Sequence, residues 1–141
     1  MKKTIRHLAS AMAVAVFLII AFGSDDEETI EAEISTQDPA ITVSASKLYA
    51  DYEDNGIAAD GKYKDKVLLV TGKVNDIDRD FMDKIYVTLK GDEYFGDIQC
   101  FFAESHVGEA SQLSKGQTIT VKGRCDGQSM NVLLQGCIIE Q

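Results

Sequence analysis

Few residues in this chain have the type and spacing that a catalytic site, a nucleotide site or a metal site needs. Gly56, Gly61 and Lys62 come close to the pattern of a phosphate-binding loop, but Tyr63 follows where a Ser or Thr would hold magnesium. The segment also follows a predicted helix and precedes a predicted strand, which is the reverse of the order that such a loop requires. We therefore expect a turn that leads into the first long strand, and no bound nucleotide.

Nucleophilic catalysis has equally little support. Ser105 and His106 are the one adjacent pair of nucleophile and base, and neighbours on a short helix point in different directions. No Gly-x-Ser-x-Gly sequence is present. The chain has only 2 His, which disfavours histidine-rich metal sites and most acid-base machinery. The sequence predicts a protein that is not an enzyme and has no metal or cofactor.

Three aspartates alternate as they do in a calcium loop. They are Asp76, Asp78 and Asp80, but Phe81 stands where the loop needs Gly and Val87 where it needs a bidentate Glu. An EF-hand is therefore excluded. A solvated hairpin turn is the favoured interpretation of this segment, and a weak calcium site at its tip is the alternative.

Residues 1–23 have the order of an export signal. Three cationic residues within the first six precede an uncharged apolar run over residues 8–22. As a helix this run covers roughly 22 Å, which is short of the ~30 Å hydrocarbon core of a membrane. Ala21 and Gly23 offer small residues for a signal peptidase. We expect a cleaved signal peptide, or an uncleaved signal anchor, and in either case a protein outside the cytoplasm, secreted, periplasmic or anchored in the membrane.

Residues 24–40 form an acidic segment without apolar periodicity. It contains seven acidic residues and no Lys or Arg, so it buries too little surface to offset the entropy of ordering. We expect a flexible linker, followed by one folded domain over residues 41–141. The formal net charge of the chain is -9, which disfavours binding to phosphate backbones.

The folded part begins with an amphipathic helix. Ser44 is a suitable N-cap, and Gly56 is expected to end the helix. The positions spaced for one apolar face are Ala45, Leu48, Tyr49 and Tyr52. This face is expected to lie on a sheet.

Beyond this helix the apolar period changes from 3.6 residues to 2, which is typical of strands. The predicted strands are residues 66–77, with Gly72 as a bulge, 84–90, 97–102, 118–125 and 130–139. Turns are expected over 78–83 and 126–129, and a short helix over 104–113. Three strands, a helix and two strands is the order of the OB-fold, a mainly β, five-stranded Greek-key barrel. A split open sheet is the alternative.

The same segments resemble a known family. The stretch NGIAADGKYKDK, the following VTGKV, and the late segments KGQTITVKGRCDG and LLQGCII are similar to the bacterial tRNA_anti-like OB-fold family, whose members are often described as lipoprotein candidates. The resemblance covers roughly residues 44–140 and implies an OB-fold, but no catalytic or binding residues. Ser24 stands where a lipoprotein would have its lipidated Cys.

The three cysteines, at 100, 125 and 137, lack the spacing of a zinc site. If residues 126–129 are the loop, Cys125 lies beside Met130 and cannot bridge to Cys137 without breaking the ladder. Strands three and five are neighbours in the OB order. The sequence therefore leaves two states open, a disulfide between Cys100 and Cys137, or three buried thiols.

OB-folds bind ligands on the outer face of strands two and three and at the flanking loops. The candidate ligand-binding residues there are Tyr86, Thr88, Lys90, Gln99 and Phe101, with Tyr94 in the loop between the strands. The aromatic side chains could stack on bases or form a second apolar layer under the N-terminal helix, which is the favoured alternative.

The most consistent function is a non-enzymatic OB-fold binding module that recognises a protein or a small ligand. The alternative is a protein that binds single-stranded nucleic acid. A contiguous row of cations through Lys84, Lys90, Lys122 and Arg124 would favour the nucleic acid.

Overall fold

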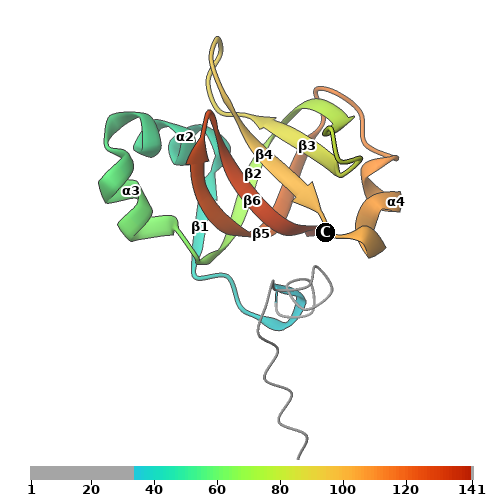
Figure 1. Cartoon of the computed structure of the whole chain (residues 1–141), viewed down its shortest axis with the longest axis horizontal. Helices are drawn as coiled ribbons and strands as arrows, with labels where there is room; N and C mark the ends of the chain where they lie inside the picture. The colour runs from blue at the N-terminus through green and yellow to red at the C-terminus, as the bar shows by residue number, and fades with distance from the viewer. Residues whose placement is uncertain (1–33, 141) are drawn as a thin grey trace, which may run out of the picture.

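The computed structural model describes residues 34–140, in which six strands wrap around a common core and short helices flank them (Figure 1). The elements are β1 (Ile41–Ser44), α2 (Ala45–Asp54), α3 (Gly56–Tyr63), β2 (Val67–Arg79), β3 (Ile85–Lys90), β4 (Asp97–Phe102), η1 (Glu104–His106), α4 (Val107–Ala110), β5 (Thr118–Ser129) and β6 (Asn131–Glu140). No helix within this range is long and apolar enough to cross a membrane.

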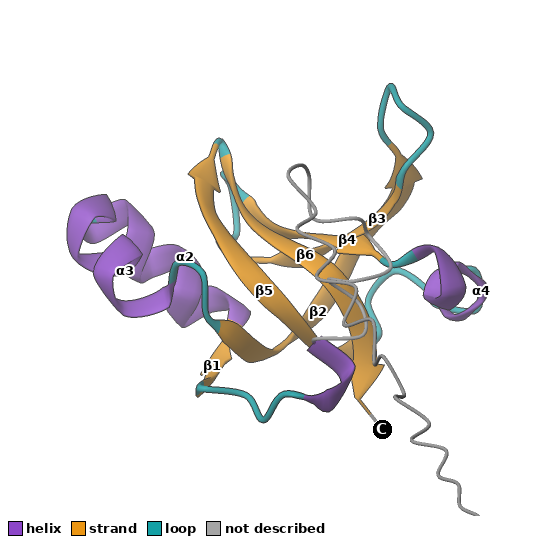
Figure 2. Ribbon diagram, turned by 60° about the horizontal axis from the view of Figure 1, so that its bottom comes forward, coloured by secondary structure: helices purple, strands orange, loops and turns teal. Residues whose placement is uncertain are grey.

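Five of the strands close into a barrel. The sheet order is β1-β2-β3-β4-β6-β5, and an additional pairing of β2 with β5 closes it. β4 and β6 run parallel, while β2–β3, β3–β4, β5–β6 and β2–β5 are antiparallel. In Figure 2 the helices α2 and α3 lie on one side of the barrel, and α4 lies on the other. The predicted OB-fold, with a helix before the barrel and a short helical segment between its third and fourth strands, is confirmed.

The predicted N-terminal helix is also confirmed. The Ser44 side chain accepts a hydrogen bond from the Lys47 amide at 3.2 Å, which caps α2. The four predicted apolar positions of this helix are all buried. The strand β1, which was not predicted, ends at this cap residue and pairs in parallel with Leu68–Thr71 of β2.

The predicted turn after this helix is wrong, because residues 56–63 form a second helix, α3. Asn55 has an extended backbone (φ -159°) that ends α2, and its side chain accepts a hydrogen bond from the Ala58 amide at 3.1 Å. Asn55 thus separates two helices, and Gly56 begins the second instead of ending the first. Gly61 and Lys62 lie within α3, so no phosphate-binding loop exists here.

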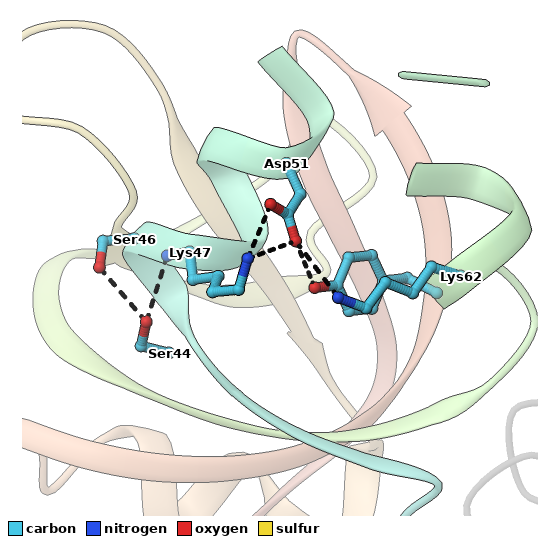
Figure 3. Close-up of polar contacts among 6 residues, drawn as sticks. Ser44, Ser46, Lys47, Asp51 and Lys62 are labelled. Atoms are coloured by element: carbon cyan, nitrogen blue, oxygen red, sulfur yellow. Dashed lines mark hydrogen bonds and ion pairs between the residues drawn. The ribbon is translucent and has the colours of Figure 1, made fainter. Parts of the chain in front are cut away.

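A carboxylate joins these two helices (Figure 3). Asp51 of α2 accepts a hydrogen bond from the Tyr63 hydroxyl of α3 at 2.6 Å and from the Lys47 ammonium at 3.0 Å. Lys62 lies 3.7 Å away as an ion pair. The hydrogen bond from Tyr63, followed by that from Lys47, holds the pKa of the Asp51 carboxyl below its usual value.

The bulge predicted at Gly72 is not found there. Gly72 pairs regularly with Ile119 of β5, whereas the irregularity of the β2–β3 ladder lies between Val74 and Asp76. A Cβ at position 72 would lie 2.7 Å from the Cβ of Ala45 and 3.1 Å from that of Leu89. Glycine is needed at this position because α2 packs closely against the barrel.

The last hairpin differs from its prediction as well. β5 extends to Ser129, and the turn is at Met130, which has a φ of 64°. Residues 126–129 therefore belong to the strand, and Gly127 lies within a register shift between Cys125 and Gln128. As a result Cys125 lies opposite Leu134, and not beside Met130.

The short helix predicted over residues 104–113 is only partly present. It divides into η1 and α4 and ends at Ala110, which is buried. The predicted signal peptide, and residues 24–33 of the predicted linker, lie outside the described residues. Within residues 34–40, Ile34 is buried, Pro39 is half-buried and the other five residues are exposed.

Candidate functional site

Five of the six predicted ligand-binding residues share the outer face of β3 and β4. Across the ladder Tyr86 faces Phe101, Thr88 faces Gln99, and Lys90 faces Asp97. The intervening side chains of both strands point into the core, as the alternation of a strand requires. The outer face continues onto β2, where Asp78 pairs with Tyr86 and Asp76 with Thr88.

An aromatic pair lies at one end of this outer face. The rings of Tyr86 and Phe101 are 5.9 Å apart between centroids and meet edge to face, at 62°. Both side chains are half-buried. Burial, together with the carboxylates of β2 and the following turn, raises the pKa of the Tyr86 hydroxyl. Three aspartates therefore lie near the Tyr86 hydroxyl.

Thr88 is less accessible than the sequence analysis assumed. It is 6% exposed, and its hydroxyl oxygen is buried with no hydrogen-bond partner among the described residues. A buried hydroxyl without a partner costs roughly 1–3 kcal/mol. Thr88 therefore offers little surface to a ligand, and Gln99, which is half-buried, is the more accessible of the two.

Tyr94 does not belong to the same surface. It lies in the loop of residues 91–96, beyond the pair of Lys90 with Asp97 that ends the hairpin. Four residue positions separate this pair from Tyr86 and Phe101, or about 14 Å along the strands. The predicted site is thus divided between the outer face and the rim of the barrel.

The loop at the rim closes around Tyr49 of α2. A Cβ at Gly91 would lie 2.7 Å from the Tyr49 ring, and one at Gly96, which has a φ of 104°, would overlap it. The loop is also held by a hydrogen bond from the Asp92 amide to the Gly96 carbonyl at 3.1 Å. This role of the two glycines was not predicted, although the sequence shows them on either side of a Tyr-Phe pair.

An acidic hollow of about 380 Å³ lies beside this loop. Its lining residues come from α2 and from the start of the loop: Ser46, Tyr49, Ala50, Glu53, Asp54, Gly91 and Asp92. Three of them are acidic and none is basic. Burial, followed by the charge of Glu53, raises the pKa of the Tyr49 hydroxyl, which keeps its proton.

The cations that would mark a nucleic-acid interface do not form a row. Lys84 and Lys90 lie at opposite ends of β3, and Lys122 is only 6% exposed. On the outer face the neighbours of the aromatic pair are aspartates, and one of them, Asp76, forms an ion pair with Lys115 at 3.2 Å.

The cysteines are buried thiols in this structure. Cys100 lies opposite Leu134, and Cys137 lies opposite Phe102, so the two cysteines are diagonal neighbours across β4 and β6. Burial, and then the neighbouring Cys100, raises the pKa of the Cys137 thiol well above its usual value. The disulfide between them stays a prediction.

Catalytic and metal sites have little support among residues 34–140. His106 lies 3.1 Å from the carboxylate of Glu109, which belongs to the same helical segment. The aspartates of the predicted calcium alternative have other partners, since Asp80 accepts hydrogen bonds from the amides of Met82 and Lys84 at 2.8 and 2.9 Å. No group of three metal-ligating side chains occurs in this part of the chain.

Known structures share the fold of this chain. A candidate nucleic acid-binding lipoprotein from Klebsiella pneumoniae is 22% identical, covers 79% of this chain and 97% of its own, and superimposes with a TM-score of 0.59. An OBody bound to hen egg-white lysozyme (13% identity, 55% and 84% coverage, TM-score 0.43) and the Stn1–Ten1 complex of S. pombe (16%, 53% and 58%, 0.40) are more distant.

No protein with a curated description matches the chain. The model of the tRNA_anti-like family matches residues 1–138, which is nearly the whole sequence and reaches into β6, the last strand of the barrel. The closed five-stranded barrel agrees with that match, and the chain belongs to the tRNA_anti-like family of OB-fold proteins.

Proposed function

We propose that this protein is a non-enzymatic binding module outside the cytoplasm, and that it recognises a protein or a small ligand through the outer face of β3 and β4. The observation that carries the proposal is the half-buried pair of Tyr86 and Phe101 on that face. The barrel interior is filled by apolar side chains that are almost fully buried. Only the outer wall and the rims are therefore available for recognition.

The charges on the outer face favour a protein or a small ligand over nucleic acid. Asp76 and Asp78 lie directly beside the aromatic pair and its neighbour Thr88. A phosphate backbone that crossed this face would meet carboxylates where nucleic-acid binders place Lys and Arg. Half-buried aromatic rings with polar neighbours suit a protein surface or a ligand with an apolar body.

The location outside the cytoplasm is supported by two observations. Residues 1–23 have the cationic head and apolar run of a signal peptide or signal anchor. The protein from Klebsiella pneumoniae that shares the fold is described as a lipoprotein. Because Ser24 replaces the lipidated Cys in this chain, attachment to a membrane would depend on the apolar segment itself.

Photocrosslinking in the native host tests the proposed function. A photoreactive phenylalanine analogue is placed at position 101, and as a matched control at position 57, where the exposed Ile57 lies on α3. We expect an adduct at position 101 that proteases remove and nucleases do not, or a small-molecule adduct, and none at position 57. A nuclease-sensitive adduct, or equal yields at both positions, would contradict the proposal.

Single-stranded nucleic acid is the second candidate. The aromatic pair could stack on bases, and the Klebsiella pneumoniae protein is described as a candidate nucleic acid-binder. Fluorescence anisotropy of labelled 12-nucleotide DNA and RNA separates the two candidates. A binder with several phosphate contacts would weaken by at least about tenfold between 50 and 200 mM salt. We expect no saturable binding at either salt concentration.

A further inference from the structure

Three exposed apolar side chains lie on two neighbouring loops at one rim of the barrel. They are Tyr94 and Phe95 of the loop 91–96 and Met130 of the last hairpin, and they are 78%, 80% and 92% exposed. A hydrogen bond of 3.0 Å from the Asp97 amide to the Asn131 side chain joins the bases of the two loops. We name these three residues the rim patch. Large apolar side chains exposed together are typical of interaction sites.

Hydrogen bonds and close packing hold the loops of the rim patch in place. The Tyr94 amide donates to the Asp92 carboxylate at 2.8 Å, and the glycines at both ends of the loop close around the buried Tyr49. On the other side, Gln128 at the end of β5 donates to Glu53 of α2 at 2.9 Å. A surface whose loops are already held in place loses less entropy when a partner binds.

The electrostatic surroundings of the rim patch are acidic. The hollow beside it has Glu53, Asp54 and Asp92 among its lining residues and no Lys or Arg, and Glu93 precedes Tyr94 in the loop. The carboxylates of the hollow would attract a cation, and the rings of Tyr94 and Phe95 offer cation–π contacts beside them. A partner that complements this rim carries Lys or Arg next to an apolar side chain.

We propose that the rim patch and the acidic hollow bind a protein partner through a segment that combines a Lys or Arg with an apolar residue. The apolar residue packs on Tyr94 and Phe95, and the cation enters the hollow between α2 and the loop. An anionic lipid surface does not fit, because Asp92 and Glu93 would face its headgroups. In Figure 1 the loop also stands at the top of the barrel, whereas residues 34–40, which follow the predicted anchor, lie below it.

This second surface is independent of the proposed function. The rim patch and the aromatic pair of Tyr86 and Phe101 lie at opposite ends of the β3–β4 hairpin, so each can be disabled without the other. The test places the photoreactive phenylalanine analogue at position 94 of the full chain in the native host, with position 57 as the control. Crosslinked peptides are then sequenced by mass spectrometry.

We expect partner peptides with a Lys or Arg within a few residues of the crosslinked position, and no adduct at position 57. The substitution Asp54→Lys, which leaves the hydrogen bond from Gln128 to Glu53 in place, should lower the yield about tenfold. Asp78→Lys on the outer face should leave the yield unchanged. The proposal would be overturned if position 94 gave no adduct, or an adduct with lipid, nucleic acid or a second copy of the chain. It would also be overturned if the charge reversal left the yield unchanged.

Discussion

Replacing Gly72 with alanine should destabilise the protein, although alanine is usually tolerated in a strand. The added Cβ would lie 2.7 Å from that of Ala45 and 3.1 Å from that of Leu89, and separations under about 3 Å do not occur between real side chains. Both neighbours are buried and have little room to move. The helix α2 therefore has to shift away from the barrel.

The magnitude follows from two opposing effects. Overpacking a filled site costs about 1–3 kcal/mol, whereas losing a glycine restricts the unfolded chain and returns about 0.4–1 kcal/mol. The net loss should be about 1–2 kcal/mol, and each kcal/mol lowers the Tm of a domain of this size by about 4–8 °C. Urea unfolding should show a lower midpoint with an unchanged slope.

Two variants control this experiment. Gly61→Ala lies on α3, where a Cβ would meet nothing within 4 Å, so it should stabilise the protein by up to about 1 kcal/mol. In an Ala45→Gly background the closer of the two contacts is absent, and Gly72→Ala should cost less than in the wild type. If Gly72→Ala is neutral, or if its cost is the same in both backgrounds, the close packing of α2 on the barrel is not what requires glycine.

Three further predictions concern the groups that hold the helices and strands together. Asp51→Asn should lower the Tyr63 pKa from about 12, as followed by ultraviolet titration. Because the folded-state pKa of Asp51 is lowered, the ionised carboxylate stabilises the fold above its unfolded pKa of about 4, and this stabilisation is lost as the pH falls further. The difference in unfolding free energy between the wild type and this variant should therefore shrink in acid. Tyr52→Phe removes the hydroxyl that donates to Asp60 at 3.0 Å and lies 3.6 Å from the Cys125 sulfur. It should cost about 0.5–1.5 kcal/mol in urea unfolding, and an unchanged midpoint would mean that these two contacts contribute nothing. Mass spectrometry after alkylation should find three thiols that react only when the protein unfolds, because all three cysteines are fully buried. A mass lower by two hydrogens would instead establish the predicted bridge.

Local patterns in the sequence determined most of the elements of the barrel. The alternation of apolar residues over 84–90 and 97–102 became β3 and β4 with the expected inward side chains, because a period of 2 identifies the buried face of a strand without further information. Ser44 as the cap, and the helical spacing of the four apolar residues after it, defined α2 in the same local way. The order of these elements was then enough to predict an OB-fold.

Local sequence patterns did not predict the elements whose stability comes from residues far away in the chain. α3 contains two glycines and has little intrinsic helical propensity, but it forms because Ala59 and Tyr63 are buried against the rest of the domain. β1 has only four residues, and it exists as a strand because β2 offers it a free edge. The position of the last turn depended on the register between β5 and β6, and not on the residues that usually form turns.

The candidate site shows the same division. The sequence by itself determined that Tyr86, Gln99 and Phe101 share one face of neighbouring strands, since strand alternation leaves no other choice. Only the tertiary structure decided that Thr88 is buried on that face, and that Tyr94 joins Met130 at a rim. Burial and convergence depend on which loops meet across the closed barrel, and closure brings together residues that are far apart in the chain.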